Sequence, residues 1–485
     1  MAKENKSEGQ KLADKLCFNP KNCWEGLTAD REEEVEKFAA AYKLFLDAGK
    51  TERECTAAAL KLLAEHGFVD IETLEGRRLK AGMGVFQNIH GKALIFAVIG
   101  KRPPVEGCNI LGAHIDSPRL DLKQNPLYED SDLALFDTHY YGGIKKYQWT
   151  AIPLAMHGLF ITEAGKKIEV RIGEEKDDPV FTITDLLPHL AREQMQKKAS
   201  EAVEGEDLDV LAGSRPYNDK DVKEKVKLRL LSLLHERFAV REQDFASAEI
   251  EFVPAFGARD LGLDRSMIGA YGHDDRCCAW PALMALAALV SKKEKTARTA
   301  VCYLSDKEET GSAGNTGACS KGFENFIAAL CAGTGAGTGA ELRRCLSRSA
   351  MLSADVSAAF DPAYAPVFDK KNTSFLGKGL VLTKYTGSGG KYGASDANAE
   401  FCAQVQALMN RNKINWQFGE LGKVDKGGGG TIALHAANLG IEVLDCGIPV
   451  LSMHSPFEVI SKIDLYTACQ GYLAFLREDF AGENI

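Results

Sequence analysis

Three short apolar runs without polar alternation place the strongest constraint on the fold of this chain. They span residues 93–99, 109–113 and 300–304. A strand with one face in water alternates apolar and polar side chains, whereas a strand buried on both faces reads as a continuous apolar run. These runs therefore predict strands of a parallel or mixed sheet that is covered by helices on both sides.

Helical patterns alternate with these and further strand-like runs. The spacing of apolar residues predicts helices over 29–66 (in two parts, the second from 51), 281–293, 396–411 and 464–476, and strands over 299–304, 349–354 and 441–445. This alternation is typical of the α/β class. The glycine-rich segment 332–340 lacks the spacing of a dinucleotide-binding loop, and we interpret it as a flexible connection.

The character of the chain changes between residues 119 and 262. Charged clusters appear there, and short alternating runs at 167–172 and 249–253 are typical of antiparallel, half-solvated strands. We predict an inserted, mostly β domain over 119–262. The remaining segments, 1–118 and 263–485, then form one discontinuous domain. Within the insert, we interpret 196–227 as a surface loop and a solvated helix face.

The net charge of the chain indicates which binding partners are unfavourable, and its cysteine content indicates its cellular compartment. The 485 residues include 59 Lys and Arg against 68 Asp and Glu, a formal net charge of −9. An acidic chain of this kind does not favour nucleic acid or anionic membrane as a partner. The first ten residues are polar and unlike a signal peptide, and the 13 cysteines include no C-x-x-C pair. We therefore expect reduced, mostly buried thiols, the adjacent Cys277 and Cys278 among them, and a cytoplasmic location.

Five segments carry residue types that bind metals or transfer protons. Each follows an apolar, strand-like run. Taken singly, each also has a structural interpretation, such as a helix cap or a buried histidine. The residues are His114 and Asp116; Asp274 and Asp275; Asp306, Glu308 and Glu309; Asp355; and His454.

The co-occurrence of these segments favours a metal site over five separate structural roles. If the strands are neighbours, two histidines and at least three carboxylates meet at one edge of the sheet. Nitrogen and oxygen donors without thiolate suit a hydrolytic pair of Zn²⁺, Mn²⁺ or Co²⁺ ions. A carboxylate that bridges two ions, together with an unligated acid as base, is the pattern of two-metal hydrolases.

At these residues the chain resembles the aspartyl aminopeptidases, a family of co-catalytic zinc exopeptidases. The resemblance extends from about residue 12 to the end. Its motifs are G-A-H-I-D-S-P-R at 112–119, Y-G-H-D-D-R at 271–276, D-K-E-E-T-G-S at 306–312, S-A-D-V at 353–356 and S-M-H-S-P at 452–456. The resemblance implies an α/β zinc exopeptidase domain, phosphorylase/hydrolase-like with a mixed sheet, that carries an inserted dimerisation domain.

The resemblance also implies a role for each residue of these motifs. His114 and Asp355 would bind one metal ion, Glu309 and His454 the other, and Asp274 would bridge the two. Glu308 would be the general base, and Asp116 would orient His114. The two ions would be Zn²⁺, with Co²⁺ and Mn²⁺ as the alternatives.

Three further residues are assigned through the same resemblance. His189, in the segment Leu187-Pro188-His189-Leu190, would reach into the active site of a neighbouring subunit. Lys384 and Tyr392 would recognise an acidic substrate side chain, although the segment between them is one residue longer than the family's spacing. The glycine-rich stretch 424–431 resembles one near the family's site, and a plain loop is its alternative interpretation.

These observations lead to one hypothesis and two alternatives. The first is a metal-dependent aminopeptidase that removes N-terminal Asp or Glu from peptides and assembles from dimers into a dodecamer, as the family does. The second is an aminopeptidase of broad or neutral specificity on the same scaffold. The third is a metal-stabilised scaffold protein without turnover, against which the retention of Glu308 beside five ligands argues.

Overall fold

The computed structural model describes residues 6–74 and 76–480, and its centre is a nine-stranded mixed sheet. The order is β1-β2-β3-β13-β4-β14-β18-β16-β17, and β13, β4, β14 and β18 are mutually parallel neighbours. The strands are β1 (Val69–Asp70), β2 (Gly84–Ile89), β3 (Ala93–Val98), β4 (Cys108–His114), β13 (Thr299–Ser305), β14 (Ala350–Ser353), β16 (Leu380–Thr383), β17 (Trp416–Phe418) and β18 (Glu442–Gly447).

The three apolar runs of the sequence are confirmed as the adjacent strands β3, β13 and β4, in which every residue is buried. Successive side chains of β4 enter two different cores: Leu111 packs into one and Ile110 into the other. Both faces of the strand are therefore apolar, which is why the runs lack alternation.

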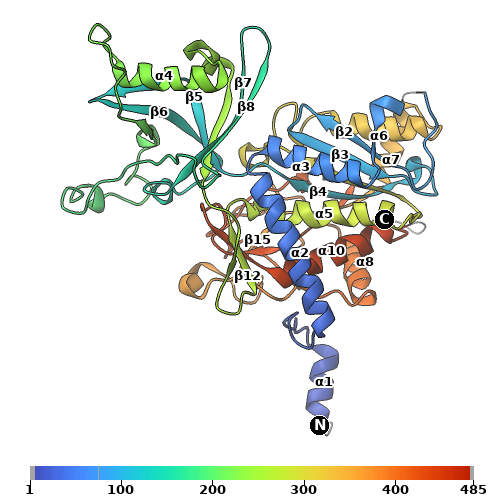
Figure 1. Cartoon of the computed structure of the whole chain (residues 1–485). Helices are drawn as coiled ribbons and strands as arrows, with labels where there is room; N and C mark the ends of the chain where they lie inside the picture. The colour runs from blue at the N-terminus through green and yellow to red at the C-terminus, as the bar shows by residue number, and fades with distance from the viewer. Residues whose placement is uncertain (1–5, 75, 481–485) are drawn as a thin grey trace.

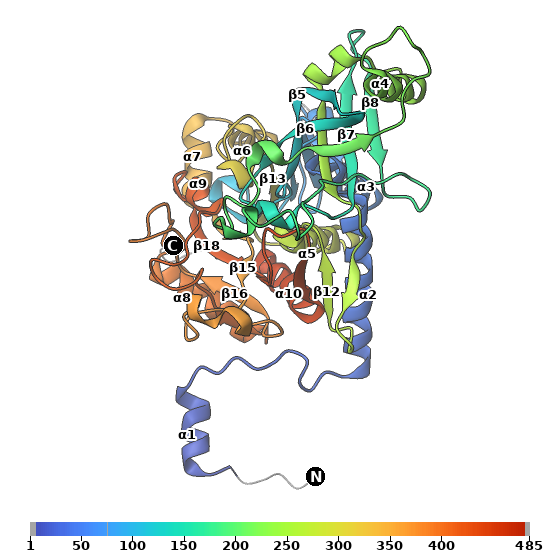
Figure 2. The ribbon, with the colours of Figure 1, turned by 90° about the vertical axis from the view of Figure 1, so that its left-hand side faces the viewer.

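Helices cover both faces of the sheet, as the α/β prediction requires. On one face lie α2 (Ala29–Ala48), α3 (Glu52–Glu65), α5 (His273–Ser291), α8 (Ala399–Arg411) and α10 (Lys462–Arg477). On the other lie α6 (Gly322–Gly333), α7 (Gly339–Ser347) and α9 (Ala433–Ala437). Figure 2 shows α6, α7 and α9 on the side of the sheet opposite α2 and α5.

A separate six-stranded antiparallel sheet is built from the middle of the chain. Its order is β8-β7-β10-β5-β6-β9, and α4 (Lys225–Phe238) packs on it. It stands beside the larger body, whereas α1 (Glu8–Leu16) projects away from that body (Figure 1). The strands are β5 (Arg119–Asp130), β6 (Leu133–Tyr141), β7 (Leu154–Ile161), β8 (Lys167–Ile172), β9 (Val210–Gly213) and β10 (Glu249–Pro254).

Two local predictions need correction. Segment 196–227 is not only loop and helix, because β9 pairs with β6 there and Leu208 and Val210 are buried. The two strands are distant in the chain, and β9 is flanked by charged residues, so its strand character is not recognisable from the sequence. The helix predicted from residue 281 begins at His273, so Pro281 lies inside α5. Proline favours the first turn of a helix, but burial of nearly the whole of α5 stabilises this helix despite the internal Pro281.

Two of the five ligand-bearing segments do not belong to the central sheet. β12 (Met267–Ala270) lies in a three-stranded sheet between β11 (Arg259–Leu261) and β20 (Glu458–Ser461). β19 (Pro449–Val450) pairs with β15 (Ser357–Ala358). The expectation of one shared sheet edge is therefore right for three segments and wrong for two. Among the helices described, none has the length and apolar character needed to cross a bilayer.

Candidate active site

Three segments of the site meet at the carboxyl edge of the parallel strands. His114 is the last residue of β4 and lies beside Ser305, the last residue of β13. Glu308 and Glu309 follow β13 in a short 3-10 turn, and Asp355 follows β14, which pairs with the other side of β4. Parallel strands end at the same edge, so the pairing of β4 with β13 and β14 brings these side chains together.

The remaining two ligand candidates arrive from the three-stranded sheet. Asp274 stands at the start of α5, four residues after β12, and His454 precedes β20. Antiparallel pairing sets Ala270 opposite Glu458. This pairing brings the loop of His454 next to the start of α5.

Asp274 lies between the two histidines. Its Oδ1 is 3.1 Å from Nε2 of His114, and its Oδ2 is 3.2 Å from Nε2 of His454. Nε2 of His454 is also 3.5 Å from Oε2 of Glu309. Two sets of potential ligand atoms result, each within 4.8 Å of one another and sharing Asp274: His114, Asp274 and Asp355 in one, and Asp274, Glu309 and His454 in the other.

Hydrogen bonds at Nδ1 leave the inner nitrogen of each histidine available. Nδ1 of His114 lies 3.1 Å from the carbonyl oxygen of Asp116, and Nδ1 of His454 lies 2.8 Å from that of Gly143. A ring nitrogen that donates to a carbonyl is protonated, so Nε2 of each neutral ring carries the lone pair. Metal-binding histidines are oriented in this way.

Glu308 belongs to neither ligand set. Its Oε2 lies 4.0 Å from Nε2 of His114, and its side chain is 18% exposed, whereas that of Glu309 is 3% exposed. Asp116 accepts the backbone N–H groups of both glutamates, each at 3.2 Å. The two neighbouring acids therefore differ in environment: the side chain of Glu309 is buried, whereas that of Glu308 is partly exposed beside the ligand sets.

The buried carboxylates of the cluster need cations to compensate their negative charge. Burial raises the pKa of Glu308 to about 7, and it raises the pKa values of Glu309 and Asp355 well above the usual range. Oε1 of Glu309 is buried and has no hydrogen-bond partner among the described residues. Divalent cations would satisfy this oxygen and offset the acids. The oxygen and nitrogen donor set fits zinc, cobalt or manganese.

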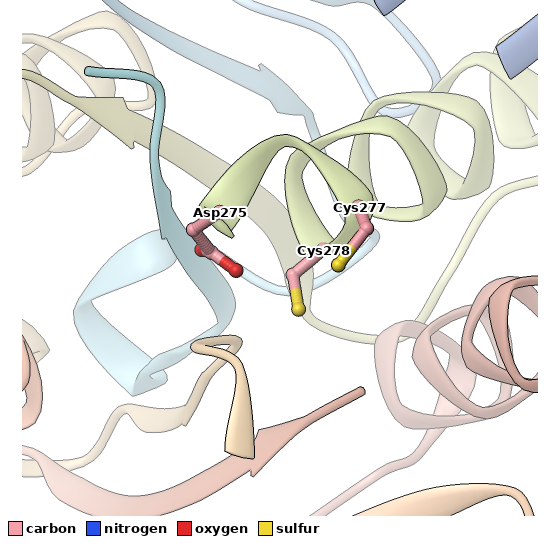
Figure 3. Close-up of side chains that lie close together, drawn as sticks. All are labelled: Asp275, Cys277 and Cys278. Carbon is pink, nitrogen blue, oxygen red and sulfur yellow. The ribbon is translucent and has the colours of Figure 1, made fainter. Parts of the chain in front are cut away.

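A third group of potential ligands lies beneath the site. Asp275, Cys277 and Cys278 lie close together near the start of α5 (Figure 3). Both cysteines are buried in the main hydrophobic core, as predicted, and burial raises the pKa of each thiol. A thiol must lose its proton to bind a metal, and burial among apolar side chains opposes this loss. Oδ2 of Asp275 accepts the backbone N–H of His114 at 3.2 Å, so this acid supports a ligand from below.

The structure does not bring His189, Lys384 or Tyr392 into the cluster. His189 is exposed on a loop of the inserted segment, Lys384 is exposed after β16, and Tyr392 is 88% exposed. Within residues 6–74 and 76–480, none of these three side chains bonds to the ligand candidates. Their assigned roles remain predictions about substrate or a neighbouring subunit.

Four contributors to the site were not predicted from the sequence. The hydroxyl of Tyr141 donates to Oδ2 of Asp116 at 2.8 Å, Gly143 accepts from His454, and Gly142 lies where a Cβ atom would approach Oε2 of Glu309 to 3.1 Å. These three residues belong to the inserted segment, and no local pattern indicates them. The fourth, Glu458, is four residues beyond His454, and its acidic side chain in an apolar run was an available signal.

Comparisons with known proteins identify a family of zinc peptidases. The family model for aminopeptidase I zinc metalloproteases (M18) matches residues 45–476. A probable M18 family aminopeptidase 1 of Clostridium acetobutylicum is 49% identical over 458 residues, which cover 94% of this chain and 98% of the relative.

Solved structures share the fold. The crystal structure of an M18 family aminopeptidase from Thermotoga maritima is 43% identical, with a TM-score of 0.90, and the match covers 95% of this chain and 99% of that one. The mApe1 dodecamer of S. cerevisiae is 19% identical, with a TM-score of 0.72 over 92% of this chain and 97% of that one, and supports the fold alone.

Proposed function

This chain belongs to the M18 family of zinc metallopeptidases and is an aminopeptidase. We propose that it hydrolyses peptides with a pair of metal ions and that it prefers Asp or Glu at the N-terminus of the peptide. The observation that carries the two-metal proposal is Asp274, whose two carboxylate oxygens face two different histidines at 3.1 and 3.2 Å. A single carboxylate in that position suits a bridge between two ions.

The residues that would hold the ions form the two ligand sets. His114 and Asp355 would bind one zinc ion, Glu309 and His454 the other, and Asp274 both. Co²⁺ and Mn²⁺ suit the same donors. When bound, such a pair supplies Lewis acidity, which lowers the pKa of water toward neutrality and stabilises negative charge on the scissile carbonyl oxygen.

Glu308 would move the proton. Its carboxylate lies beside both ligand sets without belonging to either, so it is free to take a proton from the attacking water and deliver it to the leaving amine. Asp116 would keep this base in place through the backbone N–H groups of Glu308 and Glu309, while its own carbonyl orients His114.

Acidic specificity would come from Lys384 and Tyr392. Both side chains are exposed and form no ion pair within the described part of the chain. A cationic amine and a phenol hydroxyl are both suitable hydrogen-bond donors to the carboxylate of a substrate side chain. An aminopeptidase of broad specificity is the alternative, because it needs the same metal site and no such pocket.

A panel of amino-acyl fluorogenic substrates tests this specificity. We expect kcat/KM for Asp and Glu substrates to exceed that for Ala and Leu by about tenfold or more, since a charge-assisted contact contributes roughly 1.5–3 kcal/mol. Lys384→Met should remove the preference. Lys391→Met is the matched control, because Lys391 lies in the same loop and pairs with Asp396 at 3.0 Å. Equal rates across the panel would favour the broad-specificity alternative.

We also propose that the enzyme is a homo-oligomer, with residues 119–262 as a dimerisation domain and a dodecamer as the full assembly. The resemblance to the aspartyl aminopeptidases implies this assembly, and mApe1 of S. cerevisiae, which shares the fold, forms a dodecamer. His189 lies in this region, is exposed and is not bonded to the site of its own chain, which suits a residue that completes a neighbour's site. The 13 free cysteines support a cytoplasmic location.

The trans role of His189 has a direct test. We expect His189→Phe to assemble normally and lose most of its activity. His139→Phe should stay active, because His139 is an exposed histidine of β6, also within residues 119–262. Mixed oligomers of His189→Phe and Glu308→Gln subunits should regain activity, because some sites then combine an intact Glu308 with an intact His189 from the neighbour. Mixed oligomers that stay as inactive as their parents would contradict the trans role.

A further inference from the structure

Glu458 holds the backbone of two of the proposed metal ligands. Its Oε2 accepts the N–H of Asp274 at 3.0 Å, and its Oε1 accepts the N–H of His454 at 2.7 Å. The residue stands at the start of β20 and is 1% exposed. One buried carboxylate therefore joins the start of α5 to the loop of His454.

These two ligands are the ones that the central sheet does not place. His114, Glu309 and Asp355 follow from strands that end side by side, but Asp274 and His454 belong to segments outside that sheet. The distance between their side chains depends on the hydrogen bonds that hold the backbone of those two segments. Besides Glu458 on the N–H side, Oγ of Ser117 donates to the carbonyl oxygen of Asp274 at 2.6 Å, so the backbone of Asp274 is held on both sides.

A structural role for Glu458 alone explains these contacts poorly. Burying a carboxylate is costly unless a cation pairs with it. Glu458 forms no ion pair with Lys or Arg within the described residues, and the acidic Asp274 is its neighbour. An apolar side chain at this position would leave the backbone N–H groups of Asp274 and His454 without an acceptor. What the carboxylate offers is two acceptor atoms at a fixed separation, which a single neutral side chain does not offer.

We infer that Glu458 is a positioning residue of the metal centre, which sets the separation of Asp274 from His454 by binding both backbone N–H groups. The inference rests on the two-metal site proposed above. In zinc proteins, loss of a group that orients a ligand lowers metal affinity or activity by about 10- to 100-fold. Glu458 acts on backbone rather than on side chains, but the ligand atoms move with it.

A matched control exists in the same protein. Asp464 on α10 is also fully buried, and its two oxygens accept the N–H groups of Gly377 and Gly379 at 2.7 Å each. It forms no hydrogen bond or ion pair with the ligand candidates within the described residues. Asp464→Asn therefore removes the same kind of buried double acceptor away from the metal centre.

The experiment compares wild type, Glu458→Gln and Asp464→Asn as purified oligomers. Gln keeps one acceptor atom but turns an NH₂ group toward the second N–H. We expect Glu458→Gln to bind at least one metal ion about 10- to 100-fold more weakly, to change the visible absorption of the Co²⁺-substituted enzyme, and to lower kcat more than it raises KM. Asp464→Asn should keep the metal affinity and the Co²⁺ spectrum even if its melting temperature falls.

Two results would overturn the inference. One is a Glu458→Gln enzyme with wild-type metal affinity and Co²⁺ spectrum; the other is an equal loss of metal in Asp464→Asn, which would mark general destabilisation. If Glu458→Gln does not fold, Glu458→Asp, which keeps the charge but is shorter by one methylene, should show the same metal defect. Wild type that binds fewer than two ions would instead refute the proposed two-metal site.

Discussion

Glu308→Gln is expected to lower kcat by about 10²- to 10⁴-fold, the range for loss of a general acid–base group, while both metal ions stay bound. The reason is that Glu308 lies outside both ligand sets, with its Oε2 4.0 Å from the nearest histidine nitrogen. The amide has the same shape as the carboxylate but does not accept the proton. Steady-state kinetics and metal analysis on the same preparation measure the two effects.

The neighbouring glutamate supplies the control. Glu309 is a member of a ligand set, so Glu309→Gln should lose metal as well as activity. The two variants should therefore differ: Glu308→Gln loses turnover but keeps metal, and Glu309→Gln loses both. A Glu308→Gln enzyme with a near-wild-type rate would show that another group is the base, and one that has lost its metal would make Glu308 a ligand.

Asp274→Asn is expected to weaken the binding of both metal ions by more than about 100-fold each, beyond the range for residues that only orient a ligand, and to abolish turnover. Its two oxygens face His114 and His454, and an amide offers only one oxygen to the two sites. Asp355→Asn should affect one ion only, because Asp355 belongs to a single set. Metal content after dialysis against a graded chelator series measures these losses.

Asp445→Asn is the matched control for these two variants. Asp445 is a buried acid on the neighbouring strand β18, where Oγ1 of Thr431 donates to it at 2.8 Å, and it belongs to neither ligand set. The Asp445→Asn enzyme should therefore retain both metal ions. Loss of a single ion in Asp274→Asn would contradict the bridging role and leave two independent sites.

Much of the fold follows from burial, which is a local property of the sequence. The runs that became β3, β4 and β13 were visible because both of their faces pack into apolar cores. The start of α5 was less visible. Asp274 and Asp275 have non-helical backbone angles, and Pro281 resembled a helix start, so the pattern was set eight residues too late. Strand β9 was missed because its partner β6 is distant in the chain.

The structure brings the five predicted ligand residues together, and only some of their positions follow from the sequence. His114, Glu309 and Asp355 lie at strand ends whose register places them together, so a local pattern was enough. Tyr141 and Gly143 were missed because a tyrosine and a glycine in an antiparallel segment carry no signal for metal chemistry. His189, Lys384 and Tyr392 come from a resemblance, and their roles stay predictions.

By itself the sequence determined the chemistry, namely two imidazoles and several acids placed after apolar runs, because side-chain type and burial are written into short stretches of chain. Only the tertiary structure decided how Asp274 and His454 come to face each other. That geometry depends on the pairing of β12 with β20 and on a carboxylate 184 residues away from Asp274, Glu458. Contacts across such separations arise from packing, and no local pattern encodes them.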